Sequence, residues 1–338
     1  MTLRVQSVGS ITAGPALIAG SAACANGDLL VACNTGGDVS PGQEVHLVRS
    51  RDGGRTWQRE PVAFASRFVG GGVESGCTLT RLAAGRLLLP YADGYYLSPG
   101  QGWDRRAVFS CPFSDDHGHT WQHGGIQPFA GLEAFVYGRV VELAGGDLLL
   151  PLWGSFQRQG RWKSGVLRSR DRGLTWGEHR FIVESGVCDE TPIIRLPSGR
   201  LLALIRGLRA RPASLADTVA GRRRRQAFHV ALSEDGRIWS RPERTNLAGT
   251  APSLHLSPTG QLLAGFRSTD PSGACRIAMS PDEGRSWQTV LELVPPEGRW
   301  RHGGYPVLLN LPDGTMLATF HNNVDGWRVG CNRLVKPG

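Results

Sequence analysis

Short apolar runs, each preceded by a glycine, recur along the whole chain. Their few consecutive hydrophobic positions are bounded by turn-forming residues, which favours a short β-strand over a helix. The glycines that open these runs are Gly27, Gly85, Gly146, Gly199, Gly260 and Gly314, at intervals of 53 to 61 residues. This self-similarity predicts an architecture of six structural repeats.

A second repeated motif lies between the apolar runs. A serine is followed two residues later by an aspartate, then by a glycine and a tryptophan. We call these segments the Asp turns; they are residues 50–57, 114–121, 169–176, 233–239 and 280–287. The aspartate can accept hydrogen bonds from its own turn, the glycine can adopt positive φ, and the tryptophan can anchor the turn in apolar surface.

Units of about 55 residues, built from short strands and Gly/Asp turns, suit the four-stranded blade of a β-propeller. We therefore predict an all-β, six-bladed propeller with antiparallel blades, forming one domain over residues 1–338. The sixth unit lacks an Asp turn because the chain ends after its third strand, near residues 327–334. We expect residues 3–8 to supply its outer strand and to close the ring.

The composition agrees with a single all-β body: 40% of the 338 residues are hydrophobic, and there are 46 glycines and 10 tryptophans. No apolar stretch approaches the roughly 20 residues of a membrane helix, so no membrane partner is expected. Glycine and proline interrupt residues 15–25, which weakens them as a signal-peptide core. The sequence predicts a cytoplasmic protein and leaves secretion open.

The cysteines and histidines show no metal-binding pattern. Seven cysteines are scattered singly, with no C-x-x-C pair, and their odd number favours reduced thiols over a disulfide framework. The nine histidines have no ligand spacing. We expect no metal and no organic cofactor.

The net charge of +9 favours acidic partners, either nucleic acid or an anionic small molecule. The densest basic run is four arginines, residues 222–225, inside an insertion at residues 208–226. No aromatic residues alternate with them, as single-strand stacking would require. The run is therefore predicted to be a solvated loop, a subunit contact or a lid, and no nucleic-acid partner is expected; the oligomeric state stays open.

Residues at one register of the inner strands should converge at one end of a propeller axis. The positions nine residues before the repeat glycines are Ile18, Gly76, Tyr137, Glu190, Ala251 and Tyr305. The positions seven residues after them are Asn34, Ala92, Trp153, Arg206, Arg267 and His321. These two sets supply the candidate site residues.

The Asp turns on a six-unit β chain resemble the sialidase superfamily of six-bladed propellers, also known for BNR or Asp-box repeats. The resemblance covers the whole chain and implies the fold. It is weaker for chemistry, because the same turn occurs in binding, assembly and lyase proteins. Function must therefore be argued from the site.

The resemblance implies that Tyr305 is the catalytic nucleophile and Glu190 the base that takes its proton. A phenol with a pKa near 10 is mostly neutral at pH 7, and a carboxylate in contact with it can remove the proton as attack begins. A neutral nucleophile also avoids repulsion from an anionic sugar. Taken singly, Tyr305 could simply pack at a strand start and Glu190 could cap a turn; their shared register favours the catalytic pair.

Sialidases bind the substrate carboxylate with three arginines. By resemblance Arg206 is one of these and Arg276 a second, with Arg267 as a competing candidate. Planar guanidinium groups suit bidentate carboxylate recognition. The arginine of the N-terminal Arg-Ile-Pro segment is absent, since this chain has Thr-Ala-Gly-Pro at residues 12–15.

The general acid of sialidases lies in the loop after the second strand of the first unit. Asp38 occupies that loop here, and Glu44 is the alternative. An aspartate in a glycine-rich loop is otherwise a common turn former.

The first hypothesis is therefore a retaining exo-glycosidase that hydrolyses a terminal, acidic, sialic-acid-like sugar without a cofactor. The second is a carbohydrate-binding propeller without catalysis, in which Trp153, Tyr137, Arg206 and His321 form a cup. The third is a lyase, or a hydrolase of another sugar; a lyase would use Tyr305 or His321 as its base. All three have a carbohydrate as partner.

Overall fold

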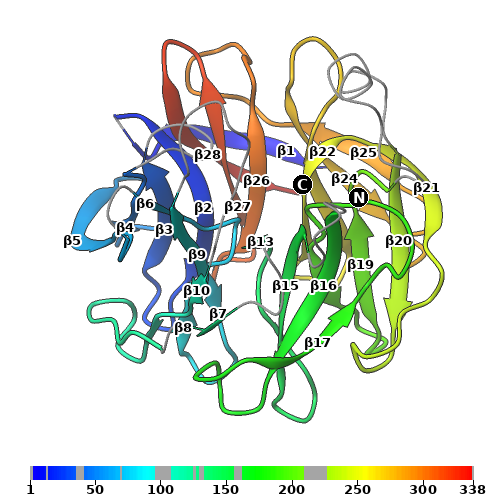
Figure 1. The fold of residues 1–338 in the computed structure, drawn as a ribbon. Coiled ribbons are helices and arrows are strands. Elements are labelled where there is room, and N and C mark those ends of the chain that lie inside the picture. The colour runs from blue at the N-terminus through cyan, green and yellow to red at the C-terminus, as the bar shows by residue number, and fades with distance from the viewer. Residues whose placement is uncertain are drawn as a thin grey trace.

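The strands of this chain form a six-bladed β-propeller, as the sequence predicts (Figure 1). The computed structural model describes residues 3–12, 14–35, 42–68, 71–95, 108–124, 127–128, 133–155, 162–208 and 227–336. The strands of each blade are antiparallel, and in blades 1 to 5 they run outward in chain order. The arginine run 222–225 lies outside the described residues.

The first three blades account for the chain from β2 to β17. Blade 1 consists of β2 (Ala16–Ala23), β3 (Leu29–Thr35), β4 (Val45–Ser50) and β5 (Gln58–Phe64). Blade 2 is split into two short sheets, made of β6 (Gly71–Glu74), β7 (Thr80–Arg81), β8 (Leu87–Leu88), β9 (Tyr91–Tyr95), β10 (Val108–Ser110), β11 (Phe113–Ser114) and β12 (Gln127–Pro128). Blade 3 consists of β13 (Glu133–Val136), β14 (Val141–Glu142), β15 (Leu148–Ser155), β16 (Trp162–Ser169) and β17 (Gly177–Phe181).

The last three blades complete the ring. Blade 4 consists of β18 (Ile193–Arg195), β19 (Leu201–Ile205), β20 (Ala227–Ser233) and β21 (Glu243–Ala248). Blade 5 consists of β22 (Thr250–Leu256), β23 (Leu262–Arg267), β24 (Cys275–Ser280) and β25 (Gln288–Glu292). Blade 6 consists of β26 (Gly304–Asn310), β27 (Met316–Asn323), β28 (Trp327–Val335) and the N-terminal β1 (Arg4–Ser10).

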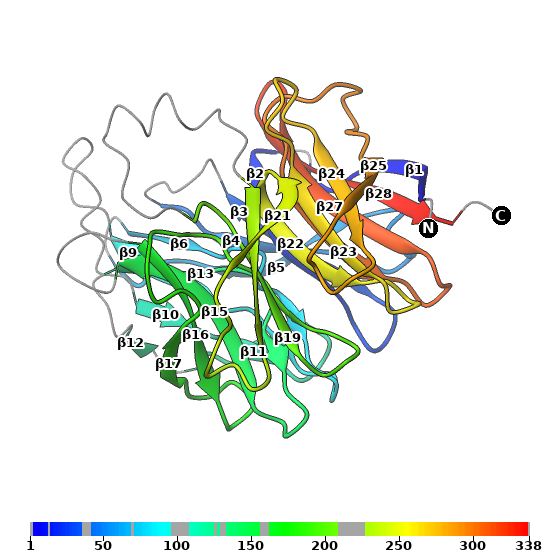
Figure 2. The same cartoon turned by 90° about the vertical axis from the view of Figure 1, so that its right-hand side faces the viewer.

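The pairing of β1 with β28 closes the propeller with strands from both ends of the chain (Figure 1), and Figure 2 shows β1 beside β28. This confirms the predicted closure, with β1 starting one residue later and ending two residues later than expected. Because the edge of β28 is hydrogen-bonded by β1, blade 6 presents no unpaired third strand.

The core is divided among the contacts between neighbouring blades. The described residues form six clusters of buried apolar side chains, one between each adjacent pair of blades. The apolar runs after the repeat glycines supply the second strands, and β19 is buried at all five positions. A second strand is apolar on both faces because each face packs on a different neighbouring blade.

The Asp turns are held by their own side chains. In blade 3 the Asp171 carboxylate accepts hydrogen bonds from the backbone N–H groups of Leu174 at 3.1 Å and Thr175 at 2.9 Å. Trp176 is buried and its indole N–H donates to the carbonyl of Gly173 at 3.1 Å. The turn thus fixes the tryptophan that packs between blades 2 and 3.

Replacing Asp171 with alanine should lower the free energy of unfolding by about 1–2 kcal/mol, because several turn donors lose their acceptor. Urea unfolding would measure the change. Glu184→Ala, at an exposed position outside the Asp turns, is the control and should change it by less than about 0.5 kcal/mol. Equal losses in both variants would contradict a special role for the turn.

All seven cysteines are buried and unpaired, in keeping with the predicted reduced thiols. Within the described ranges, no helix has the length and hydrophobicity needed to cross a bilayer.

Candidate active site at the propeller axis

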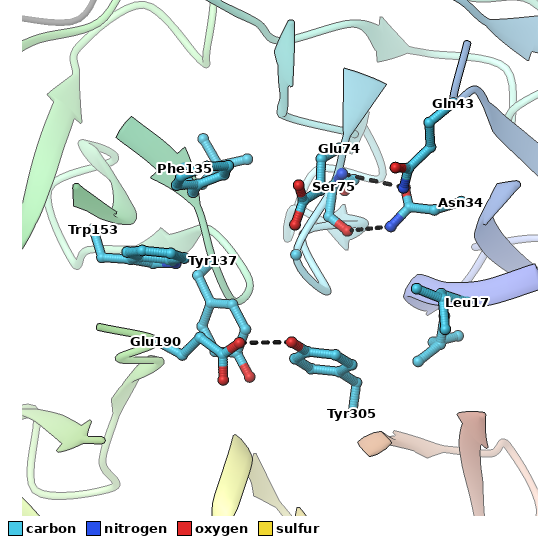
Figure 3. Close-up of a pocket in the computed structure, with 13 residues that line it drawn as sticks. Leu17, Asn34, Gln43, Glu74, Ser75, Phe135, Tyr137, Trp153, Glu190 and Tyr305 are labelled. Atoms are coloured by element: carbon cyan, nitrogen blue, oxygen red, sulfur yellow. Dashed lines mark hydrogen bonds between the residues drawn. The ribbon is translucent and has the colours of Figure 1, made fainter. Parts of the chain in front are cut away.

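One cavity gathers inner-strand residues from five blades (Figure 3). Five of the six positions nine residues before the repeat glycines line it: Ile18, Gly76, Tyr137, Glu190 and Tyr305. Ala251 of blade 5 does not. Equivalent strand positions converge because the inner strands of a propeller surround one axis.

Tyr305 and Glu190 are in direct contact inside this cavity. The Tyr305 hydroxyl donates a hydrogen bond to Glu190 Oε1 at 2.6 Å (Figure 3). Glu190 is 6% exposed, and Tyr305 is only partly buried. The phenol therefore faces the cavity with a proton acceptor already in place, which is the geometry an activated hydroxyl nucleophile requires.

The backbone at Tyr305 is strained. Its φ is 48°, in the left-handed region that a bulky side chain rarely adopts. The β26–β27 register shifts between Gly304 and Val307, so Tyr305 lies in a bulge. A bulge redirects a side chain out of the regular pleat, and strain of this kind clusters at functional sites.

Two aromatic rings hold the Tyr305 ring in place. The Tyr137 ring centroid lies 6.0 Å away and the His321 centroid 5.3 Å away. Tyr137 is buried, and its hydroxyl donates to the carbonyl of Pro252 at 2.9 Å. Burial, together with the Glu190 charge, raises the pKa of Tyr137 well above its usual value, so this second phenol stays neutral.

His321 supports the site from outside the cavity. It is 2% exposed and is not among the cavity-lining residues. Burial, aided by the charge of Arg267, lowers the pKa of His321 to about 3. The buried, neutral imidazole of His321 packs against the Tyr305 ring. This placement does not support the predicted roles of His321 in a sugar-binding cup or as a lyase base.

Arg206 contacts the catalytic candidate Glu190 from the end of β19. One guanidinium nitrogen, Nη1, forms an ion pair with Glu190, and Nε lies 3.5 Å from Asp189 Oδ1. Burial opposes the charge, but the two carboxylates raise the pKa of Arg206 well above its usual value. The structure thus places Arg206 beside Glu190, with its charge directed at protein carboxylates.

The other two arginine candidates lie in blade 5. Arg276 donates to Glu292 Oε2 at 2.9 Å and pairs with Asp270 Oδ2 at 2.6 Å. Arg267 donates to Thr250 Oγ1 at 2.8 Å and to the Gly303 carbonyl at 3.4 Å. Neither lines the cavity, so the described residues do not assemble the three-arginine clamp that the resemblance implies.

Of the two candidates for the general acid, the structure describes only Glu44. Asp38 lies outside the described residues. Glu44 is described, and its Oε2 lies 2.9 Å from His46 Nε2. Glu44 does not line the cavity, while its neighbour Gln43 does.

Aromatic side chains of blade 3 form one wall of the cavity (Figure 3). The Trp153 ring stacks on Phe135, with centroids 4.5 Å apart and an interplanar angle of 23°. Trp162 packs edge-on against Trp153 at 5.0 Å. This wall brings Trp153 to the site as predicted from its register and adds Phe135.

Polar residues of blades 1 and 2 form the facing wall (Figure 3). Asn34 exchanges two hydrogen bonds with the backbone of Ser75, at 3.1 and 3.2 Å. Glu74 and Gln43 also line this wall. Glu74 precedes Gly76 by two residues, and alternate residues of a strand point to the same face. The sequence could therefore have predicted Glu74 at the site from the position of Gly76. Gln43 has no such signal.

Among the described residues, no group of three histidine, cysteine, aspartate or glutamate side chains is arranged to hold a metal ion.

A propeller of Asp turns with a polar and aromatic cavity on its axis defines the class of BNR-type proteins. The family model of the BNR repeat-like domain matches residues 98–316, and this chain belongs to that family. No curated protein matches the chain in sequence.

Solved structures share the fold at low sequence identity. A Dyadobacter fermentans protein of unknown function has a TM-score of 0.76 and 19% identity, covering 99% of this chain and 100% of that one. A Hadza microbial sialidase has a TM-score of 0.69 and 19% identity, covering 98% of this chain and 65% of its own. A Penicillium chrysogenum α-L-arabinanase, solved with arabinobiose, has a TM-score of 0.65 and 15% identity, covering 98% and 97%. The fold is thus shared by glycosidases that act on different sugars.

Proposed function

We propose that this protein is a glycoside hydrolase that removes a terminal sugar with retention of configuration, using Tyr305 as nucleophile and Glu190 as base. The observation that carries the proposal is the 2.6 Å hydrogen bond from the Tyr305 hydroxyl to Glu190 at the axis cavity. The glycosidases among the structural neighbours support the substrate class.

In the first step the Tyr305 oxygen forms a bond to the anomeric carbon while the glycosidic bond breaks. The phenolic proton passes to Glu190, and the leaving oxygen takes a proton from the general acid. Asp38 remains our candidate for that acid. In the second step water attacks the anomeric carbon, returns a proton to the acid residue, and releases Tyr305, which recovers its proton from Glu190.

Arg206 has a positioning role in this proposal. Its ion pair with Glu190 fixes the carboxylate toward the phenol and offsets the charge that the base carries between turnovers. The predicted direct contact of Arg206 with a substrate carboxylate would require that pair to open.

A fluorinated-sugar trap tests the mechanism. The protein is screened with 4-nitrophenyl glycosides of arabinofuranose, galactose, glucose, glucuronic acid and N-acetylneuraminic acid, and the 2- or 3-fluoro analogue of the sugar turned over is then added. We expect mass spectrometry of peptides to locate the covalent sugar on Tyr305, and NMR to show a retained first product. A label on a carboxylate, or an inverted product, would contradict the proposal.

A binding protein without catalysis is the second candidate, favoured by the Trp153–Phe135 stack, which is suited to a sugar face. Calorimetric binding of a glycan without release of product would select it.

A further inference from the structure

We infer that a second cavity, at the end of the propeller axis remote from Tyr305, binds a small oxyanion of the phosphate or sulfate type. We call it the rear cavity. Blades 1, 2, 3 and 6 contribute its lining, which consists of residues 21–23 and 80–83, Arg139 and Leu309. None of these residues lines the axis cavity at Tyr305, so the inference is independent of the proposed function.

The rear cavity lies further along the inner strands than the axis cavity. Gly76 and Tyr305 line the axis cavity, whereas Thr80 and Leu309, four residues later in the same blades, line the rear cavity. Four residues advance about 13 Å along a regular strand. The volume of the rear cavity is about 290 Å³, many times the space that one water needs. Arg81 in its lining is exposed, so the cavity opens to solvent.

Arg139 extends across the axis from blade 3. Its Nη2 donates to the carbonyl of Ser21 in blade 1 at 2.9 Å and to that of Leu308 in blade 6 at 2.8 Å. Its Nη1 lies 3.5 Å from Nδ1 of His255 in blade 5. Blade 3 stands opposite blade 6 in a ring of six blades, so these contacts hold the guanidinium near the centre of the ring.

The charge of Arg139 has no carboxylate beside it. Its partners are two neutral carbonyls and the His255 imidazole, whose pKa burial lowers to about 3. No aspartate or glutamate is among the described residues that line the rear cavity. Glu142, on β14, accepts a hydrogen bond from the N–H of Ala83 at 2.8 Å and lies outside the lining. Burial lowers the pKa of Arg139 to about 10, so the guanidinium is cationic at neutral pH.

Other arginines with little exposed surface are paired with acids. Arg49 is 1% exposed and forms ion pairs with Asp28 and Glu60. Arg168 is 6% exposed and also pairs with a carboxylate. Removing a charge from water costs free energy unless an opposite charge compensates it. Arg139 is partly buried and departs from this pattern, and an anion is the partner that its position lacks.

Arg139 and Arg81 have donors available for such an anion. A guanidinium has five N–H groups, and the contacts above engage at most three of those of Arg139. Its Nε has no acceptor among the described residues and is not buried, so a ligand in the cavity can reach it. Arg81 adds a second guanidinium, which pairs with no carboxylate in the described part of the chain. Planar guanidinium groups match phosphate and sulfate oxygens in paired hydrogen bonds.

An anion bound by Arg139 and Arg81 connects blade 3 to blade 2. The N–H of Val140 donates to Thr80 Oγ1 at 2.9 Å, so the backbone segments that carry the two arginines are already bonded to each other. Fixing these segments before the anion arrives lowers the entropy cost of binding. Because the site exists only in the folded chain, the anion should stabilise the propeller once its concentration exceeds the Kd.

Calorimetry with inorganic phosphate tests the inference. The full chain is titrated with sodium phosphate in about 0.1 M NaCl, which screens exposed charges. We expect one site with a Kd of about 1 mM or lower, and Arg81→Gln should raise that Kd at least about tenfold, as expected when a hydrogen bond between charged groups is lost. Arg241→Gln, at an exposed position before β21, is the matched control and should leave the Kd unchanged.

Arg139→Gln should abolish phosphate binding. Because Arg139 also contacts three other blades, this variant is compared only if circular dichroism shows that it folds, and Arg81→Gln decides the outcome otherwise. Crystals soaked in sodium selenate would locate the anion by the anomalous scattering of selenium. We expect the selenate peak in the rear cavity, beside Arg139.

A phosphate Kd unchanged in Arg81→Gln would overturn the inference. So would the absence of binding heat up to about 20 mM phosphate, at which a site with the expected Kd is nearly full, or a selenate peak only elsewhere on the protein. Glucose 6-phosphate distinguishes the sources of the anion: tighter binding than phosphate indicates a phosphorylated small molecule, and equal or weaker binding indicates the free ion. Both results support the site. Tyr305→Phe should bind phosphate like the parent, so this site and the proposed hydrolase succeed or fail separately.

Discussion

Tyr305→Phe should lower kcat by at least about a thousandfold on any glycoside that the protein hydrolyses. The substitution removes only the hydroxyl oxygen, which is the atom we assign to attack on the anomeric carbon. The ring should keep its packing against Tyr137 and His321, and KM should change little. Steady-state kinetics of purified variants would measure both values.

Tyr91→Phe is the matched control, because Tyr91 is a buried tyrosine of blade 2 that does not line the cavity. It should retain the parent kcat. Circular dichroism and urea unfolding should show that both variants fold. Activity of Tyr305→Phe within tenfold of the parent would remove Tyr305 as nucleophile, and the carboxylates of the cavity would then be the candidates.

The six blades were predictable because their signals are local. The Asp turns depend on hydrogen bonds between residues at most four positions apart, such as Asp171 with Thr175. The repeat glycines fix where each second strand begins. Tyr305 and Glu190 each lie nine residues before a repeat glycine. This shared spacing predicted that they are close in space, although 115 residues separate them in sequence.

The partners of the arginines were not predictable in this way. Arg206 and Arg276 were assigned to a substrate carboxylate by resemblance. The structure pairs Arg206 with Asp189 and Glu190, which precede the neighbouring strand β18, and Arg276 with Glu292 on the outermost strand of blade 5. Which of several nearby acids an arginine contacts depends on side-chain directions across strands, and sequence spacing does not contain that information.

The split of blade 2 was also missed. Positive φ at Cys77 and a parallel bridge from Gly76 to Tyr137 interrupt the inner strand between β6 and β7. This interruption lies at the cavity, two residues beyond Glu74. Two of the irregular positions of the inner strands, Cys77 and Tyr305, thus lie at or next to the cavity, and such interruptions are common at functional sites.

Acidification from pH 6.5 to 4.5 should lower the free energy of unfolding by about 5 kcal/mol, because two buried histidines cannot take up protons in the folded state. Burial, with Arg139 nearby, lowers the pKa of His255 to about 3, and burial, with Arg267 nearby, lowers that of His321 to about 3. The unfolded chain binds both protons near pH 6.5. It therefore holds more protons than the folded chain below that pH, and each histidine contributes about 1.4 kcal/mol per pH unit.

The geometry at His255 explains why protonation is resisted. Its Nε2 lies 2.7 Å from Asn310 Oδ1, and its Nδ1 lies 3.5 Å from Nη1 of Arg139. The neutral ring can donate to Asn310 and present a lone pair to the guanidinium. A second proton would be placed against that cation, whose own Nη2 is held by the carbonyls of Ser21 and Leu308.

Urea unfolding at several pH values would measure this slope. His255→Gln should reduce the slope by about 1.4 kcal/mol per pH unit, while His119→Gln, at an exposed turn position, should leave it unchanged. Carboxylates affect the free energy of unfolding over a lower pH range than the histidines do. Hydrogen bonds from Thr56 lower the pKa of Asp52, so the stability that the ionised Asp52 contributes is lost only below about pH 4. An unfolding free energy that stays flat to pH 4.5 would show that the ring nitrogens are hydrated, and that the inner strands around the axis open more readily than their burial implies.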